Sequence, residues 1–351
     1  MLLDVNDKAL TQEYDDFIAQ SEFGNFYQSR QWSEVKNNWK RHYFYIREEG
    51  EIRAAMSVLS VTDSVAGKDF FYASRGPVCD LYDLNTVKAL IEEVREYALE
   101  HNGFLLRVDP EVKHDEELVS QYAKEDLDFL KNPALTSQPL MSLILELKGR
   151  SADEILMDLT KGTRYEIRTS YRRGVEPYVG ERSDLELFYK FMVEMSERQS
   201  IGHRPLDYFK RVYDAYGETS RLHFARYEGE LIAAVLLIGF NKTLTYLYGA
   251  DPIYVKQNQS AQLQFENIKH AVEKGYDYYD MGGIFSTDID DGLYKFKQKF
   301  TENNIVSWIG NLDIVLDQGA YDKYYSHHME RYDWTKTDVS KEDILKKYPR
   351  R

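Results

Sequence analysis

One lysine stands where helical spacing would turn it toward the protein interior. A helix over residues 292–300 would carry on one face three apolar residues and this lysine: Leu293, Phe296, Lys297 and Phe300. Moving an ammonium group out of water is costly unless the group meets an anion. Lys297 is therefore a candidate for binding an anion, and an internal ion pair is the alternative.

Lys36 and Arg204 are candidates for binding phosphate groups. A helix capped by Ser29 would align Lys36 with an apolar stripe formed by Trp32, Val35 and Trp39. The same desolvation argument applies to Lys36, with an internal salt bridge as the alternative. Arg204 precedes a second predicted helix, and its planar guanidinium can contact two phosphate oxygens at once.

A capping box of Ser151 and Glu154 opens a predicted helix that becomes strongly basic at its far end. Five cations follow on that helix: Lys161, Arg164, Arg168, Arg172 and Arg173. The chain has a net charge of −14, which argues against general coating of nucleic acid, because sequence-independent affinity comes from neutralising phosphates. Any RNA contact is thus expected to be local. This helix is its candidate, with a solvated helix face as the alternative.

Some catalytic classes have no matching pattern in the sequence. The eight histidines are scattered without a His-x-x-x-His pair, so no metal site is expected. No Gly-x-Ser-x-Gly elbow indicates a serine nucleophile. The single cysteine, Cys79, excludes a disulfide framework and a cysteine-rich metal site, and it fits a reducing compartment.

Length and composition predict a folded protein of two domains, since the 351 residues are 43% hydrophobic and 30% charged. The start, Met1–Asp7, carries acids and no basic segment, so no signal peptide is expected. The longest apolar run, Ile232–Phe240, is too short for a membrane span. We therefore expect a cytoplasmic protein. The basic C-terminal stretch Asp338–Arg351 could touch a membrane or tRNA peripherally, although a solvated terminus is the preferred interpretation.

An internal repeat indicates a duplicated unit. The segment Arg47–Ala55 reappears as Arg226–Ala234, and each copy holds a Glu-Gly turn between alternating apolar runs, which predicts a β-hairpin. Each hairpin is followed by a predicted strand and then by an amphipathic helix, over Thr86–Glu100 and Ala261–Lys274. Each helix leads into an extended segment that is expected to finish with an acid, Asp109 in the first copy and Asp280 in the second.

This order of elements resembles the N-acetyltransferase (GNAT) fold. We predict a mixed α/β (α+β) protein of two tandem domains: residues 1–147, completed by the C-terminal segment 309–351, and residues 148–308. Acetyltransferases of this fold hold the pyrophosphate of coenzyme A on a glycine-containing loop. The corresponding segments, Cys79–Asn85 and Val255–Ala261, contain no glycine. Coenzyme A is therefore not expected as the donor, and no cofactor is predicted.

Six short motifs run in order along nearly the whole chain. They are Ser29-x-Gln31-Trp32-x-x-Val35-Lys36, Arg75-Gly76-Pro77, Arg107-Val108-Asp109-Pro110-Glu111, Arg164-Tyr165-x-Ile167-Arg168, Tyr246-x-Tyr248-Gly249-Ala250 and Leu293-Tyr294-x-Phe296-Lys297-x-x-Phe300. Together they resemble the Fem family (FemABX) of peptidoglycan interpeptide-bridge aminoacyltransferases. The duplicated unit agrees with the tandem acetyltransferase-like domains of that family.

The resemblance implies transfer of an amino acid from aminoacyl-tRNA to the side-chain amine on the stem peptide of a cell-wall precursor, UDP-MurNAc-pentapeptide or lipid II. Alanine is the expected amino acid, with serine and glycine as alternatives. It further implies that Lys36 and Arg204 bind the diphosphate of the precursor, and that Lys297 lies at the reaction centre. The residues expected beside these three are Trp39, Asp109, Tyr208, Tyr246, Tyr248 and Phe296.

Long-armed members of the family insert a helical coiled coil into the second domain. Here only a short segment separates the helix of Tyr208 from the strand at Leu222, so the chain resembles the arm-less FemX type. For tRNA, the candidate contacts are Arg164, Arg168 and Arg172. Two other functions stay open: a coenzyme A-dependent N-acyltransferase of the GNAT fold, and a non-catalytic protein that binds tRNA or the cell-wall precursor.

Overall fold

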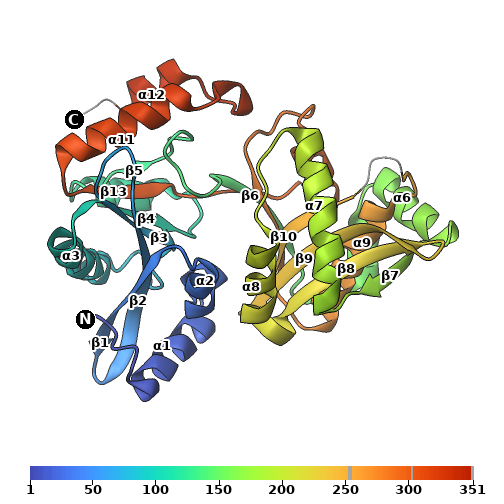
Figure 1. Ribbon diagram of the computed structural model, residues 1–351, viewed down its shortest axis with the longest axis horizontal. Helices are drawn as coiled ribbons and strands as arrows, with labels where there is room; N and C mark the ends of the chain where they lie inside the picture. Colours follow the sequence, from blue (N-terminus) through green and yellow to red (C-terminus); the bar gives the residue numbers. More distant parts are fainter. Residues whose placement is uncertain (252–254, 302, 349–351) are drawn as a thin grey trace. The chain divides into compact units, whose positions relative to one another are not determined.

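The computed structural model describes residues 1–251, 255–301 and 303–348, and Figure 1 shows its chain path. The chain divides into two compact units. Unit 1 comprises Met1–Met141, Gly283–Asp288 and Val306–Arg351, and unit 2 comprises Ser142–Gly282 and Ile289–Ile305. Each unit is built on its own β-sheet.

Unit 1 contains a six-stranded sheet in the order β1-β2-β3-β4-β13-β5. Its strands are β1 (Lys40–Glu48), β2 (Glu51–Thr62), β3 (Asp69–Arg75), β4 (Gly103–Pro110), β5 (Phe129–Leu130) and β13 (Asn311–Val315). The first three strands form an antiparallel meander, and β4 lies parallel to β3. A parallel pair requires a long crossover, and helix α3 (Leu84–Glu100) supplies it.

Helices cover both faces of this first sheet. Besides α3 they are α1 (Lys8–Gln20), α2 (Arg30–Val35), α4 (Glu116–Ala123), α11 (Gln318–Arg331) and α12 (Lys341–Lys347), with short 3-10 turns η1 (Phe26–Gln28) and η5 (Trp334–Lys336). Because neighbouring strand residues point to opposite faces, Phe71 packs in the core with Leu90 of α3, whereas Phe70 packs with Tyr324 of α11. The sheet is therefore sandwiched between two apolar layers.

The C-terminal stretch belongs to the second of these layers. Ile344 of α12 is 3% exposed, and the Tyr348 hydroxyl accepts a hydrogen bond of 2.9 Å from the backbone N–H of Lys131. The interpretation of this stretch as a solvated terminus is thus wrong for Ile344 and Tyr348, whereas most of the other described residues from Asp338 onward are exposed. A single buried residue on a helix of seven has no periodicity by which the sequence could reveal it.

The second sheet has seven strands in the order β12-β6-β11-β10-β9-β8-β7, and most of it belongs to unit 2, whose boundaries cut through β12 and through the ends of β6 and β11. Its strands are β6 (Met141–Glu146), β7 (Glu176–Val179), β8 (Ser220–Tyr227), β9 (Glu230–Phe240), β10 (Thr243–Ala250), β11 (Tyr278–Ile284) and β12 (Ile305–Ser307). The long apolar run of the sequence is the interior strand β9. Among the described residues no helix is long and apolar enough to cross a membrane.

The helices of unit 2 also form two layers, which Figure 1 shows around β8 and β9. They are α5 (Ala152–Asp158), α6 (Lys161–Arg172), α7 (Leu185–Gln199), α8 (Leu206–Tyr216), α9 (Gln259–Glu273) and α10 (Gly292–Lys297), with 3-10 turns η2 (Arg182–Asp184), η3 (Gly217–Thr219) and η4 (Gln298–Phe300). Ile155, Ile167 and Ile268 bring α5, α6 and α9 into one core cluster. On α7 and α8, Phe188 and Phe209 pack with ring centroids 5.1 Å apart.

The predicted repeat is confirmed down to its turns. The hairpin β1–β2 turns through Glu49 and Gly50 with φ of 49° and 89°, and the hairpin β8–β9 turns through Glu228 and Gly229 with φ of 50° and 86°. Two consecutive positive φ values are what a two-residue hairpin turn needs, which explains the glycine in both copies. Each hairpin also has a register shift two residue pairs before the turn. The predicted fold of two tandem acetyltransferase-like α/β units is confirmed.

Three predicted helices differ from the structure in extent. The helix opened by Ser151 ends at Asp158, and the basic residues lie on a separate helix, α6, because Leu159 is extended and Thr160 caps the new start. Helix α2 ends at Val35, so Lys36 and Trp39 lie beyond it. The segment 292–300 is α-helical only to Lys297, and Leu293 is 42% exposed rather than inward. In addition, β11 does not finish at Asp280 but continues to Ile284.

Candidate functional site

Lys297 is buried near the end of the short helix α10. Asp291 starts this helix by accepting a hydrogen bond of 2.7 Å from the backbone N–H of Tyr294. Lys297 is 6% exposed, which confirms that it points inward. Burial lowers the pKa of Lys297 to about 8, and the carboxylates of Asp280 and Asp291 oppose this shift. The ammonium is therefore mostly charged at neutral pH but close to its titration range.

Lys297 lies where two parallel strands separate. The ladder between β10 and β11 extends only from the pair Thr243 and Tyr278 to the pair Thr245 and Asp280. Just beyond it, Gly282 has a φ of 78°, and a methyl group there would lie 3.5 Å from the backbone oxygen of Tyr246 and 3.6 Å from Nζ of Lys297. The Lys297 ammonium thus lies beside Gly282, just past the point where the ladder between β10 and β11 ends.

Unit 1 has no such divergence at the equivalent position. There the ladder between β3 and β4 continues for the whole length of β3, up to the pair Arg75 and Pro110. The two copies of the fold therefore differ at this point. Of the two, the second copy is the one in which a buried cation lies where the parallel strands separate.

Asp109 is held in a buried ion pair of unit 1. It is 3% exposed, its Oδ1 lies 3.3 Å from a guanidinium nitrogen of Arg75, and its Oδ2 accepts a hydrogen bond of 2.9 Å from the Tyr72 hydroxyl. Burial raises the pKa of Asp109, and the Arg75 guanidinium opposes that shift. Arg75 also donates to the backbone oxygen of Pro139 at 3.0 Å and lies over the Trp308 ring. Both carboxylate oxygens of Asp109 are thus engaged, one by Arg75 and one by Tyr72.

Lys36 and Trp39, both of unit 1, have different environments. Nζ of Lys36 lies 5.0 Å from the centre of the Trp32 ring, a cation–π contact, and the side chain is half-buried. The Trp39 ring packs instead on Phe70, at 6.2 Å between centroids, in the layer that α11 and α12 cover. The predicted common stripe is wrong, because the helix stops before either residue.

Three of the predicted binding residues form one cluster in unit 2. The Arg204 guanidinium lies 5.4 Å from the centre of the Tyr208 ring, and the hydroxyls of Tyr208 and Tyr248 are 3.1 Å apart. Phe209 packs edge-on against Tyr248 at 5.1 Å and supports that ring from α8. Arg204 itself is exposed, so its guanidinium is accessible to an anion while an aromatic ring orients it.

A β-bulge separates Tyr246 from Tyr248. Tyr246 pairs with Leu237 and Tyr248 with Leu236, so Leu247 is an extra residue in β10. Adjacent partners on β9 face opposite sides of the sheet, and the two tyrosines follow them. Tyr246 packs against the core that contains Phe300 and Phe296, where burial raises its pKa, whereas Tyr248 faces α8.

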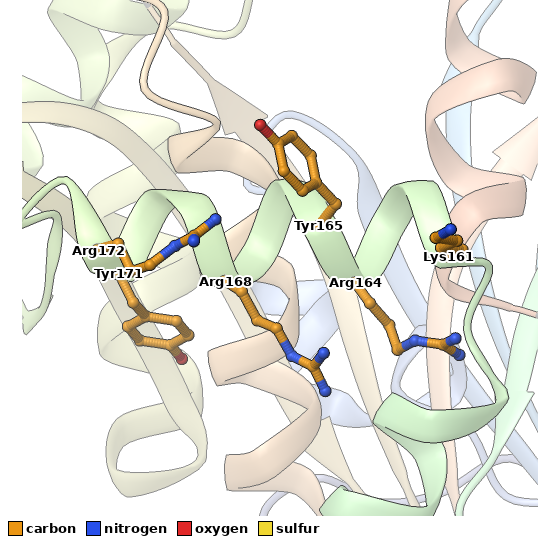
Figure 2. A pocket seen from close by; sticks show the side chains of 6 residues that line it. All are labelled: Lys161, Arg164, Tyr165, Arg168, Tyr171 and Arg172. Carbon is orange, nitrogen blue, oxygen red and sulfur yellow. The ribbon is translucent and has the colours of Figure 1, made fainter.

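The predicted tRNA contacts Arg164, Arg168 and Arg172 all lie on α6. With Lys161, Tyr165 and Tyr171 they line an open pocket of about 700 Å³, shown in Figure 2. The sequence predicts Lys161 as one of the cations of this helix, but it does not predict either tyrosine as part of the surface, although Tyr165 is 63% exposed. Their signal is the helical spacing that interleaves them with the cations.

Two further residues near Lys297 were missed as site residues. Asp280 accepts a hydrogen bond of 2.7 Å from the backbone N–H of Gly282, which fixes the turn that faces the lysine. The sequence signal for this turn is an acid followed by a glycine pair after an apolar strand. Within the described part of the chain, no group of three or more His, Cys, Asp or Glu side chains is arranged to hold a metal ion.

Known proteins are similar to this chain over most of its length. The FemAB family profile matches residues 10–230 and 223–328. A UDP-N-acetylmuramoylpentapeptide-lysine N(6)-alanyltransferase of Weissella viridescens is 33% identical over 91% of this chain and 98% of its own length. A lipid II:glycine glycyltransferase of Staphylococcus epidermidis is 22% identical over 88% of this chain and 92% of its own length. The crystal structure of FemX superimposes with a TM-score of 0.82 at 20% identity, over 92% of this chain and 99% of that one.

Proposed function

Because the chain belongs to the FemAB family, we propose that it is an aminoacyltransferase that builds the interpeptide bridge of peptidoglycan. The proposed acceptor is the side-chain amine of the lysine in UDP-MurNAc-pentapeptide, and the proposed amino acid is alanine. The name of the 33%-identical relative supports both choices. The alignment with the lipid II glycyltransferase runs over 387 positions, more than this chain has, so that relative carries inserted residues.

The observation that carries the proposal is the buried cation of Lys297 beside the diverging strands. In the proposed reaction the neutral acceptor amine attacks the ester carbonyl of the donor, a C–N bond forms, and the C–O bond to the ribose breaks. The amine loses a proton, and the departing ribose oxygen gains one. Lys297 would stabilise the oxyanion that forms on the carbonyl, a contribution of roughly 3 to 4 kcal/mol where single donors have been removed.

The remaining predicted residues have supporting roles in the proposal. Lys36 and Arg204 bind phosphate oxygens of the precursor, since each cation is already held over an aromatic ring. The Tyr208 ring orients Arg204, and Tyr248 supports Tyr208 through their paired hydroxyls. The contacts of Asp109 favour a positioning role through Arg75 and Tyr72 over direct handling of the amine. Phe296 and Tyr246 belong to the apolar surroundings that keep Lys297 away from water.

For the donor we propose aminoacyl-tRNA. An ester-activated amino acid needs no covalent enzyme intermediate, and positioning the amine against it can supply about 7 kcal/mol or more of barrier reduction. A soluble nucleotide acceptor and a tRNA donor both place the reaction in the cytoplasm. The basic helix α6 is the proposed contact for the tRNA.

The test is transfer of radiolabelled alanine from charged tRNA to UDP-MurNAc-pentapeptide, with lipid II as a parallel acceptor. We expect labelled nucleotide product that disappears after ribonuclease treatment of the donor. Product with lipid II alone would replace the soluble acceptor with the lipid-linked one. Binding of both substrates without product would identify a binding protein, and stabilisation by acetyl-coenzyme A with acetyl transfer would identify an acyltransferase that uses coenzyme A.

A further inference from the structure

The outward side of helix α6 carries positive charge that no carboxylate of the described chain neutralises. Lys161, Arg168 and Arg172 are exposed, and none of the three pairs with an acid in the part of the chain that is described. At 1.5 Å rise per residue, they are separated along the helix by about 10 Å and 6 Å. The three cations therefore form a stripe about as long as several nucleotides of a nucleic-acid strand.

Three acids close to this stripe in the chain or on α9 are already engaged, and one of them, Asp158, pairs with Arg150 at 2.8 Å. Glu166, the one acid within α6, has both carboxylate oxygens 3.0 Å from Nζ of Lys299. Glu266 of α9 accepts hydrogen bonds from Lys269, at 3.0 Å, and from the Tyr171 hydroxyl. On a chain with a net charge of −14, this makes α6 a local exception rather than part of a uniformly mixed surface.

Arg164 differs from the other cations of α6. Its guanidinium donates to the backbone oxygen of Leu159 at 2.6 Å and to that of Met157. These are carbonyls at the end of α5, which lack partners within that helix. Both bonds use Nη1 of Arg164, which therefore helps to fix the break between α5 and α6. Arg168 and Arg172 instead contact side-chain atoms, Sδ of Met157 at 3.9 Å and Oγ1 of Thr169 at 3.0 Å.

Tyr165 adds an aromatic surface to the stripe. It is 63% exposed, and the i, i+4, i+7, i+11 spacing of Lys161, Tyr165, Arg168 and Arg172 places its Cα on the same face of α6 as the three cations. Figure 2 shows the ring and the Arg168 guanidinium extending from this face toward different edges of the helix. An exposed ring beside a row of cations is the combination that binds single-stranded nucleic acid, because bases stack on the ring while phosphates meet the charges. Solvation of a charged helix face does not by itself explain an exposed aromatic ring there.

We propose that the outward side of α6 binds the RNA of the aminoacyl-tRNA donor, with Lys161, Arg168 and Arg172 contacting phosphates and Tyr165 stacking on a base. Arg164 is excluded from this contact set and has a structural role instead. The inference rests on the proposed function, which supplies an RNA donor. It assigns the donor to a surface, which the reaction alone does not do.

The experiment measures binding of the full chain to uncharged tRNA between 50 and 300 mM KCl. Each phosphate contact contributes about 0.7 to 0.9 to the slope of log affinity against log salt. Lys161→Met, Arg168→Met and Arg172→Met should each lower the slope by about that amount and weaken binding about fivefold at 150 mM salt. The triple variant should lose on the order of 100-fold. Tyr165→Ala should weaken binding while leaving the slope unchanged.

Two controls separate this inference from other effects. Lys242→Met removes the same charge from an exposed position on another element and should leave both slope and affinity unchanged. Arg164→Met should lower the melting temperature without changing the slope. A triple variant with the wild-type slope, in a protein that still transfers from tRNA, would overturn the α6 surface alone. A wild-type protein that neither binds tRNA nor transfers from it would overturn the proposed function as well.

Discussion

Replacing Lys297 with methionine should stabilise the protein while removing its activity. Burial lowers the pKa of Lys297 from 10.5 to about 8, and each pKa unit corresponds to about 1.4 kcal/mol. The charged lysine therefore costs the folded state about 3 kcal/mol at pH 7 relative to the unfolded chain. Methionine has a similar length and no charge, so Lys297→Met should raise the free energy of unfolding by up to that amount. Turnover should fall about 100-fold or more, because the oxyanion loses its cation.

The sign of the pH dependence makes this prediction specific. Below pH 8 both folded and unfolded chains carry the proton on Lys297, so the cost is fully present. Between pH 8 and 10.5 the folded chain releases that proton first, and wild-type stability rises relative to the variant. The advantage of Lys297→Met should thus be largest at pH 7 and should fade toward pH 10.5.

The assay is urea unfolding of both proteins at pH 7 and pH 10, followed by circular dichroism. Lys295→Met is the matched control, because Lys295 is exposed on the same helix, and its stability should stay within about 0.5 kcal/mol of wild type. A Lys297→Met protein that is less stable than wild type at pH 7 would show that Lys297 is a net stabilising ion-pair partner. A folded variant with unchanged turnover would remove Lys297 from the reaction.

Four further outcomes are expected. Turnover of the wild-type protein should decline above pH 8, as Lys297 loses its proton. Because arginine keeps its charge, wild-type turnover divided by that of Lys297→Arg should fall about tenfold between pH 7 and pH 9, and a constant ratio contradicts a cationic role. Lys36→Met and Arg204→Met should each weaken precursor binding with little change in turnover, as isothermal titration and initial rates would show. Asp109→Asn should destabilise the protein by about 3 to 5 kcal/mol in urea unfolding, because it leaves Arg75 buried without its counter-charge. Gly282→Ala should lower turnover on the order of tenfold or more, since it strains a φ of 78° in the backbone beside Lys297; wild-type rates would show that this turn does not set the site.

Local patterns in the sequence were sufficient for the duplicated fold. The Glu-Gly turns, the alternating runs beside them and the amphipathic helices that follow depend on neighbouring residues, so they can be predicted without tertiary information. The inward position of Lys297 was also predictable from helical spacing. Its surroundings were not, because Leu293 is exposed and Tyr294 is buried where the same spacing predicted the reverse.

Helix ends and C-terminal packing required the tertiary structure. Arg164 belongs to the same basic run as Arg168 and Arg172, and nothing in the sequence distinguishes it from them. Its guanidinium meets the carbonyls at the end of α5 only because the chain breaks at Leu159. Ile344 is likewise buried by α11 and the sheet rather than by its own helix.

The sequence by itself determined the family, the repeated α/β unit and the residue types available for chemistry, because these depend on local pattern and on short motifs. Only the tertiary structure decided what those residues contact. The extra residue at Leu247 sends Tyr246 and Tyr248 to opposite faces of the sheet. Asp109 is enclosed with Arg75, and Lys297 lies beside Gly282, where β10 separates from β11 beyond Asp280. Each of these outcomes depends on strand register and packing between segments far apart in the chain, which no local pattern encodes.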